Sequence, residues 1–255
     1  MLQVDLNCDM GEGFGVYRTS PDSELMKYIT SANIACGFHA GDAATIRRTV
    51  KLALEHGVAI GAHPGLPDLA GFGRRVMGIT PEEAYEMTVY QLGAVQAFAK
   101  SEGGAVAHVK PHGALYNMAA GNRQLADAIA EAVYKVDPSL LLFGLAGSEL
   151  IHAGKAIGLH TINEVFADRT YESDGSLTPR GAAGAVIADA GRAAEQAVNM
   201  IKNGEVLTRK QSRLILKAET VCVHGDTPGA LEHVKQLREA LEAEGIAVKK
   251  AGKEA

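Results

Sequence analysis

The sequence predicts an α/β fold in which one parallel sheet closes into a single-domain (β/α)7-like barrel related to the TIM barrel. Strand-like and helix-like segments alternate without a linker or a change of composition, and this order requires helical crossovers between parallel strands. Polar residues follow nearly every predicted strand, whereas an open doubly wound sheet would gather them at one switch point. The 255 residues match the roughly 250 of such a barrel, so we expect one domain spanning residues 1–255.

The first predicted strand, residues 4–9, alternates apolar side chains with Asp5, Asn7 and Asp9. A strand with this period of two presents two different faces. The polar face runs directly into a Gly-rich turn at residues 10–15, which suits a strand whose inward face forms a site. A solvated edge strand is the alternative.

The remaining elements follow from hydrophobic periodicity and capping signals. Residues 80–83, Thr-Pro-Glu-Glu, form a capping box with proline at the first helical position. Strands are expected at 32–36, 58–63, 105–112, 140–145, 160–166 and 220–224, with a short one at 246–248. Helices are expected at 20–29, 42–57, 80–104, 122–137, 148–158, in a stretch ending at 203, and from 227 onward, with residues 205–217 irregular or a small hairpin.

Composition excludes several classes of function. The net charge of −5 leaves no basic surplus for nucleic acid or an anionic membrane, and tryptophan is absent. No apolar run approaches the roughly 20 residues that span a bilayer, and no signal-peptide pattern opens the chain, so we expect a cytoplasmic protein. Cys8, Cys36 and Cys222 contain no C-x-x-C pair, which argues against both a disulfide framework and a structural zinc site.

Candidate functional residues follow six of the predicted strands, where a barrel builds its site. A single polar residue there is explained by a loop or a helix cap, as Asp42 is by capping the next helix. Six strands that end alike are not explained in this way. The residues are Asp9 and Glu12; His39 and Asp42; His63 and Asp68; Lys110 and His112; Glu164, Asp168 and Arg169; His224 and Asp226.

The rise of a strand separates these residues by depth. At about 3.3 Å per residue, Asp5 lies roughly 13 Å below Asp9 on the same strand. Asp9 therefore belongs to the rim, and Asp5 points into the barrel interior, where an unpaired charge is costly. We expect a partner for Asp5 on the fourth strand, where His108, Lys110 and His112 share one face.

Signals for phosphate and metal binding are mixed. No G-x-x-x-x-G-K-[ST] motif is present, so any ATP is not held by a P-loop. Arg74 and Arg75, in a Gly-rich loop, suit a carboxylate or a phosphate, or form a solvated pair. Asp9, His39 and His63 have the ligand types of a catalytic divalent metal, although their spacing is not diagnostic.

Six segments in order carry a family resemblance that covers essentially the whole chain. They are residues 5–12 (DLNCDMGE), 33–42 (NIACGFHAGD), 61–65 (GAHPG), 109–116 (VKPHGALY), 164–169 (EVFADR) and 222–229 (CVHGDTPG). Together they closely resemble the LamB/YcsF family. The resemblance implies a barrel similar to that of polysaccharide deacetylases. It also implies the reaction of the prokaryotic 5-oxoprolinase, the ATP-dependent cleavage of 5-oxoproline (pyroglutamate) to L-glutamate, with ATP as co-substrate and 5-oxoprolinase subunits B and C as partners.

The rim residues are compatible with that chemistry. A lactam is a poor electrophile, and phosphorylation of its carbonyl oxygen would prepare the ring for opening by water. The cation over the developing charge is expected from Lys110, Arg74 or Arg75, and the base from Asp9, His39, His112 or His224. Arg169 could hold the substrate carboxylate. The expected substrate-binding residues are Glu12, Asn33, His63, Arg74, Arg75, Glu164, Asp168, Arg169 and Asp226.

Two other functions remain open from the sequence. One is a metal-dependent deacetylase or amidohydrolase that uses Asp9, His39 and His63 without ATP. The other is a non-catalytic subunit that binds the lactam while its partners carry out the chemistry. The sequence does not fix the oligomeric state, and a homo-oligomer is one option.

Overall fold

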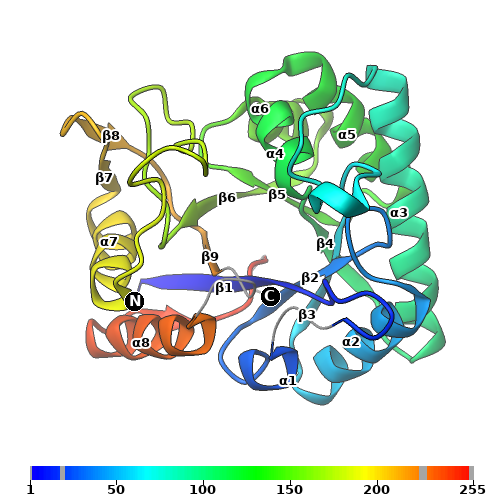
Figure 1. The fold of residues 1–255 in the computed structure, drawn as a ribbon, viewed down its shortest axis with the longest axis horizontal. Coiled ribbons are helices and arrows are strands. Elements are labelled where there is room, and N and C mark those ends of the chain that lie inside the picture. The colour runs from blue at the N-terminus through cyan, green and yellow to red at the C-terminus, as the bar shows by residue number, and fades with distance from the viewer. Residues whose placement is uncertain (1, 18–20, 224–228, 253–255) are drawn as a thin grey trace.

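Seven parallel strands close into a barrel, as the sequence predicts (Figure 1). The computed structural model describes residues 2–17, 21–223 and 229–252. In barrel order the strands are β1 (Gln3–Met10), β2 (Ser31–Ala35), β3 (Ala59–His63), β4 (Val106–Val109), β5 (Leu141–Leu145), β6 (His160–Phe166) and β9 (Thr220–Val223). The barrel closes because β1 pairs with β2 at Asn7–Ser31 and with β9 at Asp5–Thr220.

Helices surround the barrel (Figure 1). They are α1 (Asp22–Leu25), α2 (Ala43–Glu55), α3 (Pro81–Ser101), α4 (Gly113–Gly121), α5 (Arg123–Val136), α6 (Glu149–Ile157), α7 (Ala190–Asn203) and α8 (Ala230–Ala243), with a short 3-10 helix η1 (Leu69–Gly71). Strands β7 (Glu205–Leu207) and β8 (Arg213–Ile215) form an antiparallel pair, and β10 (Ala247–Val248) pairs with the start of β1. In the described residues, no helix is long and apolar enough to cross a membrane.

Most helix boundaries follow their capping signals. The Thr80–Glu83 capping box is formed at the start of α3. Asp42 accepts a hydrogen bond from the Thr45 amide at the start of α2, which confirms its role as a cap, and Asn122 caps α5 in the same way.

Two boundary predictions were wrong, and one helix was not predicted. The first helix, α1, ends at Leu25 rather than at residue 29, and the predicted cap Ser20 lies outside the described residues. Strand β4 ends at Val109 rather than at residue 112, because Pro111 has no amide hydrogen to donate. Helix α4 was not predicted; it begins at Gly113, and His112 before it makes no side-chain cap, so the sequence carries no start signal.

The barrel interior is polar. Along β1, Leu6 and Cys8 belong to the apolar core, whereas Asp5, Asn7 and Asp9 are buried and bond to side chains of other strands across the interior. The solvated edge strand considered from the sequence is therefore wrong, and the polar face of β1 points into the barrel.

Candidate active site at the mouth of the barrel

A pocket of about 270 Å³ opens where the barrel strands end. Asp9 and His63 line it at the ends of β1 and β3, and Lys110 and His112 line it after β4. A larger cavity of about 730 Å³ lies outside the barrel, between α1 and α2. The larger cavity contains none of the predicted site residues, so we assign the site to the smaller pocket.

Lys110 is the cation at the base of this pocket. Its Nζ lies 3.0 Å from Asp9 Oδ1, 2.8 Å from Glu164 Oε1 and 3.0 Å from both Asn7 Oδ1 and Cys222 Sγ. Burial by itself would lower the pKa of Lys110, but the carboxylates of Asp9 and Glu164 outweigh it and hold the pKa well above its ordinary value. Lys110 is therefore a fixed positive charge and not a base.

An amide and imidazole chain supports Asp9 from below. Asn33 Nδ2 donates to Asp9 Oδ1 at 2.9 Å and to Asn7 Oδ1 at 2.7 Å. His108 Nε2 lies 2.8 Å from Asn33 Oδ1. Burial, with the nearby charge of Lys110, lowers the pKa of His108 to about 3. His108 is thus neutral and donates from Nε2, because an amide oxygen can only accept.

Asp5 has a partner, but not the predicted one. Its carboxylate accepts hydrogen bonds from the hydroxyls of Thr220 at 2.5 Å and of Ser31 and Thr30 at 2.7 Å. Burial raises the pKa of Asp5, and these hydroxyl bonds offset part of that rise. The expectation of a partner on the fourth strand was wrong, because Lys110 bonds instead to Asp9 and Glu164, nearer the rim.

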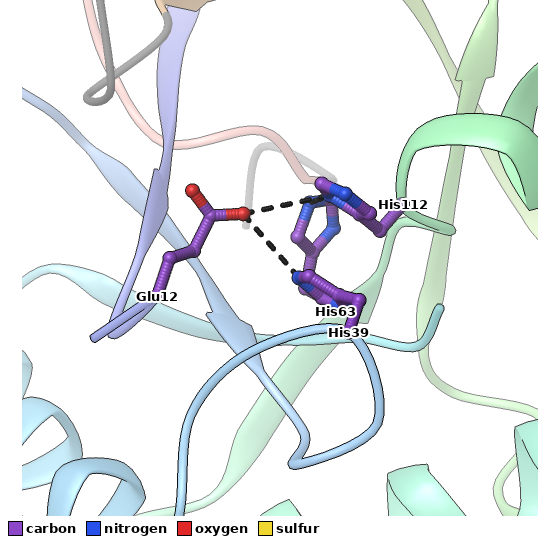
Figure 2. A group of neighbouring side chains, drawn as sticks. All are labelled: Glu12, His39, His63 and His112. Atoms are coloured by element: carbon purple, nitrogen blue, oxygen red, sulfur yellow. Dashed lines mark hydrogen bonds and ion pairs between the residues drawn. The ribbon is translucent and has the colours of Figure 1, made fainter. Parts of the chain in front are cut away.

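Glu12, His39, His63 and His112 form a buried cluster beside the pocket (Figure 2). One possible ligand atom from each side chain lies within 4.8 Å of all the others. Glu12 Oε1 is 3.3 Å from His39 Nε2 and 3.5 Å from His112 Nδ1. His112 Nδ1 is 3.0 Å from His63 Nε2, and the rings of His39 and His112 stack at 3.6 Å.

The outer nitrogens of this cluster determine where its protons lie. His63 Nδ1 is 2.6 Å from the Lys110 carbonyl oxygen, and His112 Nε2 is 2.8 Å from the Phe72 carbonyl oxygen. A carbonyl only accepts, so both of these nitrogens carry hydrogen. In neutral rings, the lone pairs of the other two nitrogens then face each other at 3.0 Å.

A divalent metal fits between these lone pairs. Burial holds the pKa of His39 and His112 well below the ordinary value, which disfavours an extra proton there. Zinc–nitrogen bonds of 2.0–2.1 Å place neighbouring ligand atoms of a tetrahedron about 3.3 Å apart, and the cluster contacts span 3.0–3.5 Å. The cluster contains the predicted ligands His39 and His63. Asp9, the third predicted ligand, pairs with Lys110 and lies 3.3 Å from His63.

Arginines line the outer part of the pocket. Arg74, Arg169 and Arg180 all border it. Arg169 is only 5% exposed, and burial, followed by the charge of Arg180, lowers its pKa to about 10. The structure separates Arg75 from Arg74: Arg75 Nε donates to Asp68 at 3.0 Å, its side chain is 67% exposed, and it does not line the pocket.

The other predicted residues lie in three places. Glu164 and Asn33 are fully buried beneath the pocket, where they bond to Lys110 and Asp9. Asp168 lines a separate small cavity towards α7 and α8. His224 and Asp226 lie outside the described residues.

Several residues that line the pocket were not predicted, among them Arg180 and Tyr116. Tyr116 ends the motif at residues 109–116, and Arg180 ends the predicted loop that follows β6. Tyr116 lies in α4, which was not predicted, and Arg180 lies far along its loop from the end of the strand. A search for arginines within long rim loops would have found Arg180.

A sequence model described as the LamB/YcsF family matches residues 4–255. The chain belongs to the LamB/YcsF family. A protein of Bacillus licheniformis named as the A subunit of 5-oxoprolinase is 59% identical over 248 residues, which cover 97% of this chain and 98% of that one. Family membership confirms the resemblance seen in the six sequence segments.

Solved structures place the LamB/YcsF chain in the same fold. The crystal structure of the lactam utilization protein from Thermus thermophilus is 44% identical with a TM-score of 0.92, covering 97% of this chain and 99% of that one. The polysaccharide deacetylase Bc1974 from Bacillus cereus shares the fold alone, with a TM-score of 0.51 at 12% identity over 99% of this chain and 93% of that one.

Proposed function

We propose that this LamB/YcsF protein is the A subunit of an ATP-dependent 5-oxoprolinase. In the proposed reaction 5-oxoproline is cleaved to L-glutamate and ATP is hydrolysed to ADP and phosphate, with subunits B and C as partners. The observation that carries the proposal is the pocket in which Lys110 and Asp9 face a group of arginines. The name of the relative that is 59% identical over nearly its whole length supports it. A cytoplasmic location, where ATP is available, is part of the proposal.

The chemistry requires that the lactam carbonyl be activated. Transfer of the terminal phosphoryl group of ATP to the carbonyl oxygen gives an O-phosphorylated lactam and ADP. Water adds to the ring carbon, the carbon–nitrogen bond breaks, and a proton passes to the nitrogen, which leaves a free amine and an acyl phosphate. A second water molecule then displaces inorganic phosphate and leaves the second carboxylate of glutamate.

The pocket residues match these steps. Lys110 supplies a fixed positive charge where negative charge develops on oxygen. Asp9, held by Lys110 and Asn33, is the candidate base for water. Arg169 offers a guanidinium for an anionic group of the substrate.

A divalent metal at the cluster of Glu12, His39, His63 and His112 is part of the same proposal. A metal bound there would lower the pKa of a coordinated water molecule. The chain contributes the ligand atoms and holds the outer nitrogens of His63 and His112 with main-chain carbonyls, which fixes the ring orientations.

Reconstitution tests the proposed function. The purified chain is assayed for glutamate release from 5-oxoproline with and without subunits B and C, and with and without ATP. We expect glutamate only when all components are present, with ADP formed in parallel. Glutamate release by the full mixture that does not depend on ATP would overturn the proposal.

The same cluster favours one second candidate, a metal-dependent amidohydrolase or deacetylase that acts without ATP. Its support is the convergence of imidazole lone pairs on one point beside Glu12. Amide hydrolysis by the isolated chain carrying a stoichiometric metal, in the absence of ATP, would establish it. A lactam-binding subunit without catalytic activity would instead show altered complex assembly and unchanged turnover after rim substitutions.

A further inference from the structure

Three arginines line one small pocket. Arg74 reaches it from the loop after β3, and Arg169 and Arg180 reach it from the loop after β6. The hydrogen bonds of Arg169 go to main-chain carbonyl oxygens, from Nη2 to Thr178 at 2.5 Å and from Nε to Ala185 at 3.3 Å. Within the described chain no carboxylate bonds to this buried guanidinium. The charges of Arg180 and Arg74 act unfavourably on the Arg169 guanidinium, and the Asp168 carboxylate offsets part of that effect. An anion in the pocket would offset more of it.

The loop that carries Arg180 is held in place before any ligand arrives. Thr178 is fully buried; its hydroxyl donates to Glu172 at 2.9 Å, and its amide donates to the Thr170 carbonyl at 2.9 Å. Pro179 then restricts the backbone. Arg180 comes two residues after Thr178, whose position is fixed by these bonds. Less conformational entropy is therefore lost when Arg180 binds a ligand.

The size and charge of the pocket indicate what kind of anion it binds. Its volume of about 270 Å³ is slightly below the roughly 300–1,000 Å³ of pockets for drug-sized ligands, which favours an anion smaller than a nucleotide. One guanidinium suffices to bind a carboxylate in bidentate fashion. A phosphoryl group carries about −1.5 to −2 charges and three acceptor oxygens, which three arginines match better.

We propose that Arg180 joins Arg74 and Arg169 in binding the phosphoryl group of an O-phosphorylated lactam, which forms elsewhere in the complex and is passed to this pocket. The proposal rests on the proposed function and adds to it a substrate form and a residue. Lys110 and Asp9 line the same pocket, so the phosphoryl site and the hydrolytic groups belong to one cavity.

Anion binding by the isolated full chain tests the residue assignment. Inorganic phosphate is titrated into the wild type and into Arg180→Ala, Arg180→Lys and Arg192→Ala at low ionic strength, by calorimetry. A charge-assisted hydrogen bond at a partly exposed site predicts about a tenfold loss of phosphate affinity in Arg180→Ala and a smaller loss in Arg180→Lys, which keeps the charge. Arg192, exposed on α7, is the matched control and should bind phosphate as the wild type does.

Coupling in the reconstituted complex tests the substrate form. If the phosphorylated lactam escapes from a weakened site and decays to free lactam and phosphate, ADP formed per glutamate rises in Arg180→Ala. A purely structural effect would lower both products together.

Two results would overturn the proposal. One is phosphate affinity in Arg180→Ala equal to that of the wild type. The other is a defect of Arg180→Ala confined to binding of subunits B and C, because the arginine would then contact a partner protein. Either result leaves the proposed function intact, since ATP-dependent glutamate release by the wild-type complex is measured separately.

Discussion

Removing the buried charge of Lys110 should destabilise the barrel strongly. Lys110→Met retains the apolar stem and removes the ammonium group, so the carboxylates of Asp9 and Glu164, at 3.0 and 2.8 Å from Nζ, lose their shared cation. Lys110 and Glu164 are 3% and 0% exposed, and breaking a buried pair on one side costs about 3–5 kcal/mol. That is a large fraction of the roughly 5–15 kcal/mol typical of a domain.

Equilibrium unfolding in urea measures this cost. Lys110→Met should unfold at a clearly lower urea concentration, and Lys110→Met combined with Glu164→Gln should recover part of the loss, because only one carboxylate is left without its cation. Lys135→Met is the control, since Lys135 forms a solvent-exposed pair with Glu131 and should leave the unfolding midpoint unchanged. A midpoint for Lys110→Met equal to that of the wild type would refute the reasoning.

Three further predictions concern the metal, the loop before α3 and the deep carboxylate. Purified protein should carry a stoichiometric divalent metal, measured by plasma mass spectrometry. The metal should be lost in His63→Ala and kept in His152→Ala, an exposed control. Active protein free of metal would contradict this prediction. Gly73→Ala should lower the free energy of unfolding by about 1–3 kcal/mol and slow turnover, because the added Cβ would lie 2.6 Å from His39 at a backbone φ of +62°. In the control Gly78→Ala the added Cβ meets no atom within 4 Å. Equal melting temperatures for the two variants would count against this prediction. Burial raises the pKa of Asp5, so its stabilising contribution is present below the unfolded pKa of about 3.9 and is lost as pH rises through the folded value. As pH rises from about 4 to 7, the free energy of unfolding of Asp5→Asn should therefore increase relative to that of the wild type. Parallel curves of unfolding free energy against pH for the two proteins would contradict this prediction.

The barrel was predictable because its main determinants are local. The alternation of apolar and polar residues along β1 indicates a strand with two different faces, and the capping box at Thr80 places the start of α3. Helix α4 was not predictable in this way, because its boundary at Gly113 depends on packing: an added Cβ would lie 2.7 Å from the Gly73 carbonyl oxygen. That contact joins two loops far apart in sequence.

The site was predictable as a set of rim residues but not as a network. The order of the strands brings Asp9, His63, Lys110 and His112 to one pocket, as expected from their positions at strand ends. Which charged side chains bond to each other depends on how far each side chain reaches and on which hydroxyl groups lie nearby. The spacing of residues in the sequence shows neither of these. Asp5 therefore bonds to hydroxyls rather than to a lysine.

The two adjacent arginines illustrate the same limit. Arg74 lines the pocket, whereas Arg75 bonds to Asp68 and ties the loop to itself. The two residues are adjacent in the sequence, so the pattern gives no sign that only Arg75 bonds to Asp68.

The central claim is that the lactam ring is opened at the mouth of this barrel, and Asp9→Asn tests it most directly. The measurement is the initial rate of ATP-dependent glutamate release by the complex with subunits B and C, with Asp127→Asn, on the exposed face of α5, as the control. Loss of a general base predicts a rate at least about 100-fold lower in a complex that still assembles. A complex containing Asp9→Asn that releases glutamate at the wild-type rate would contradict the account.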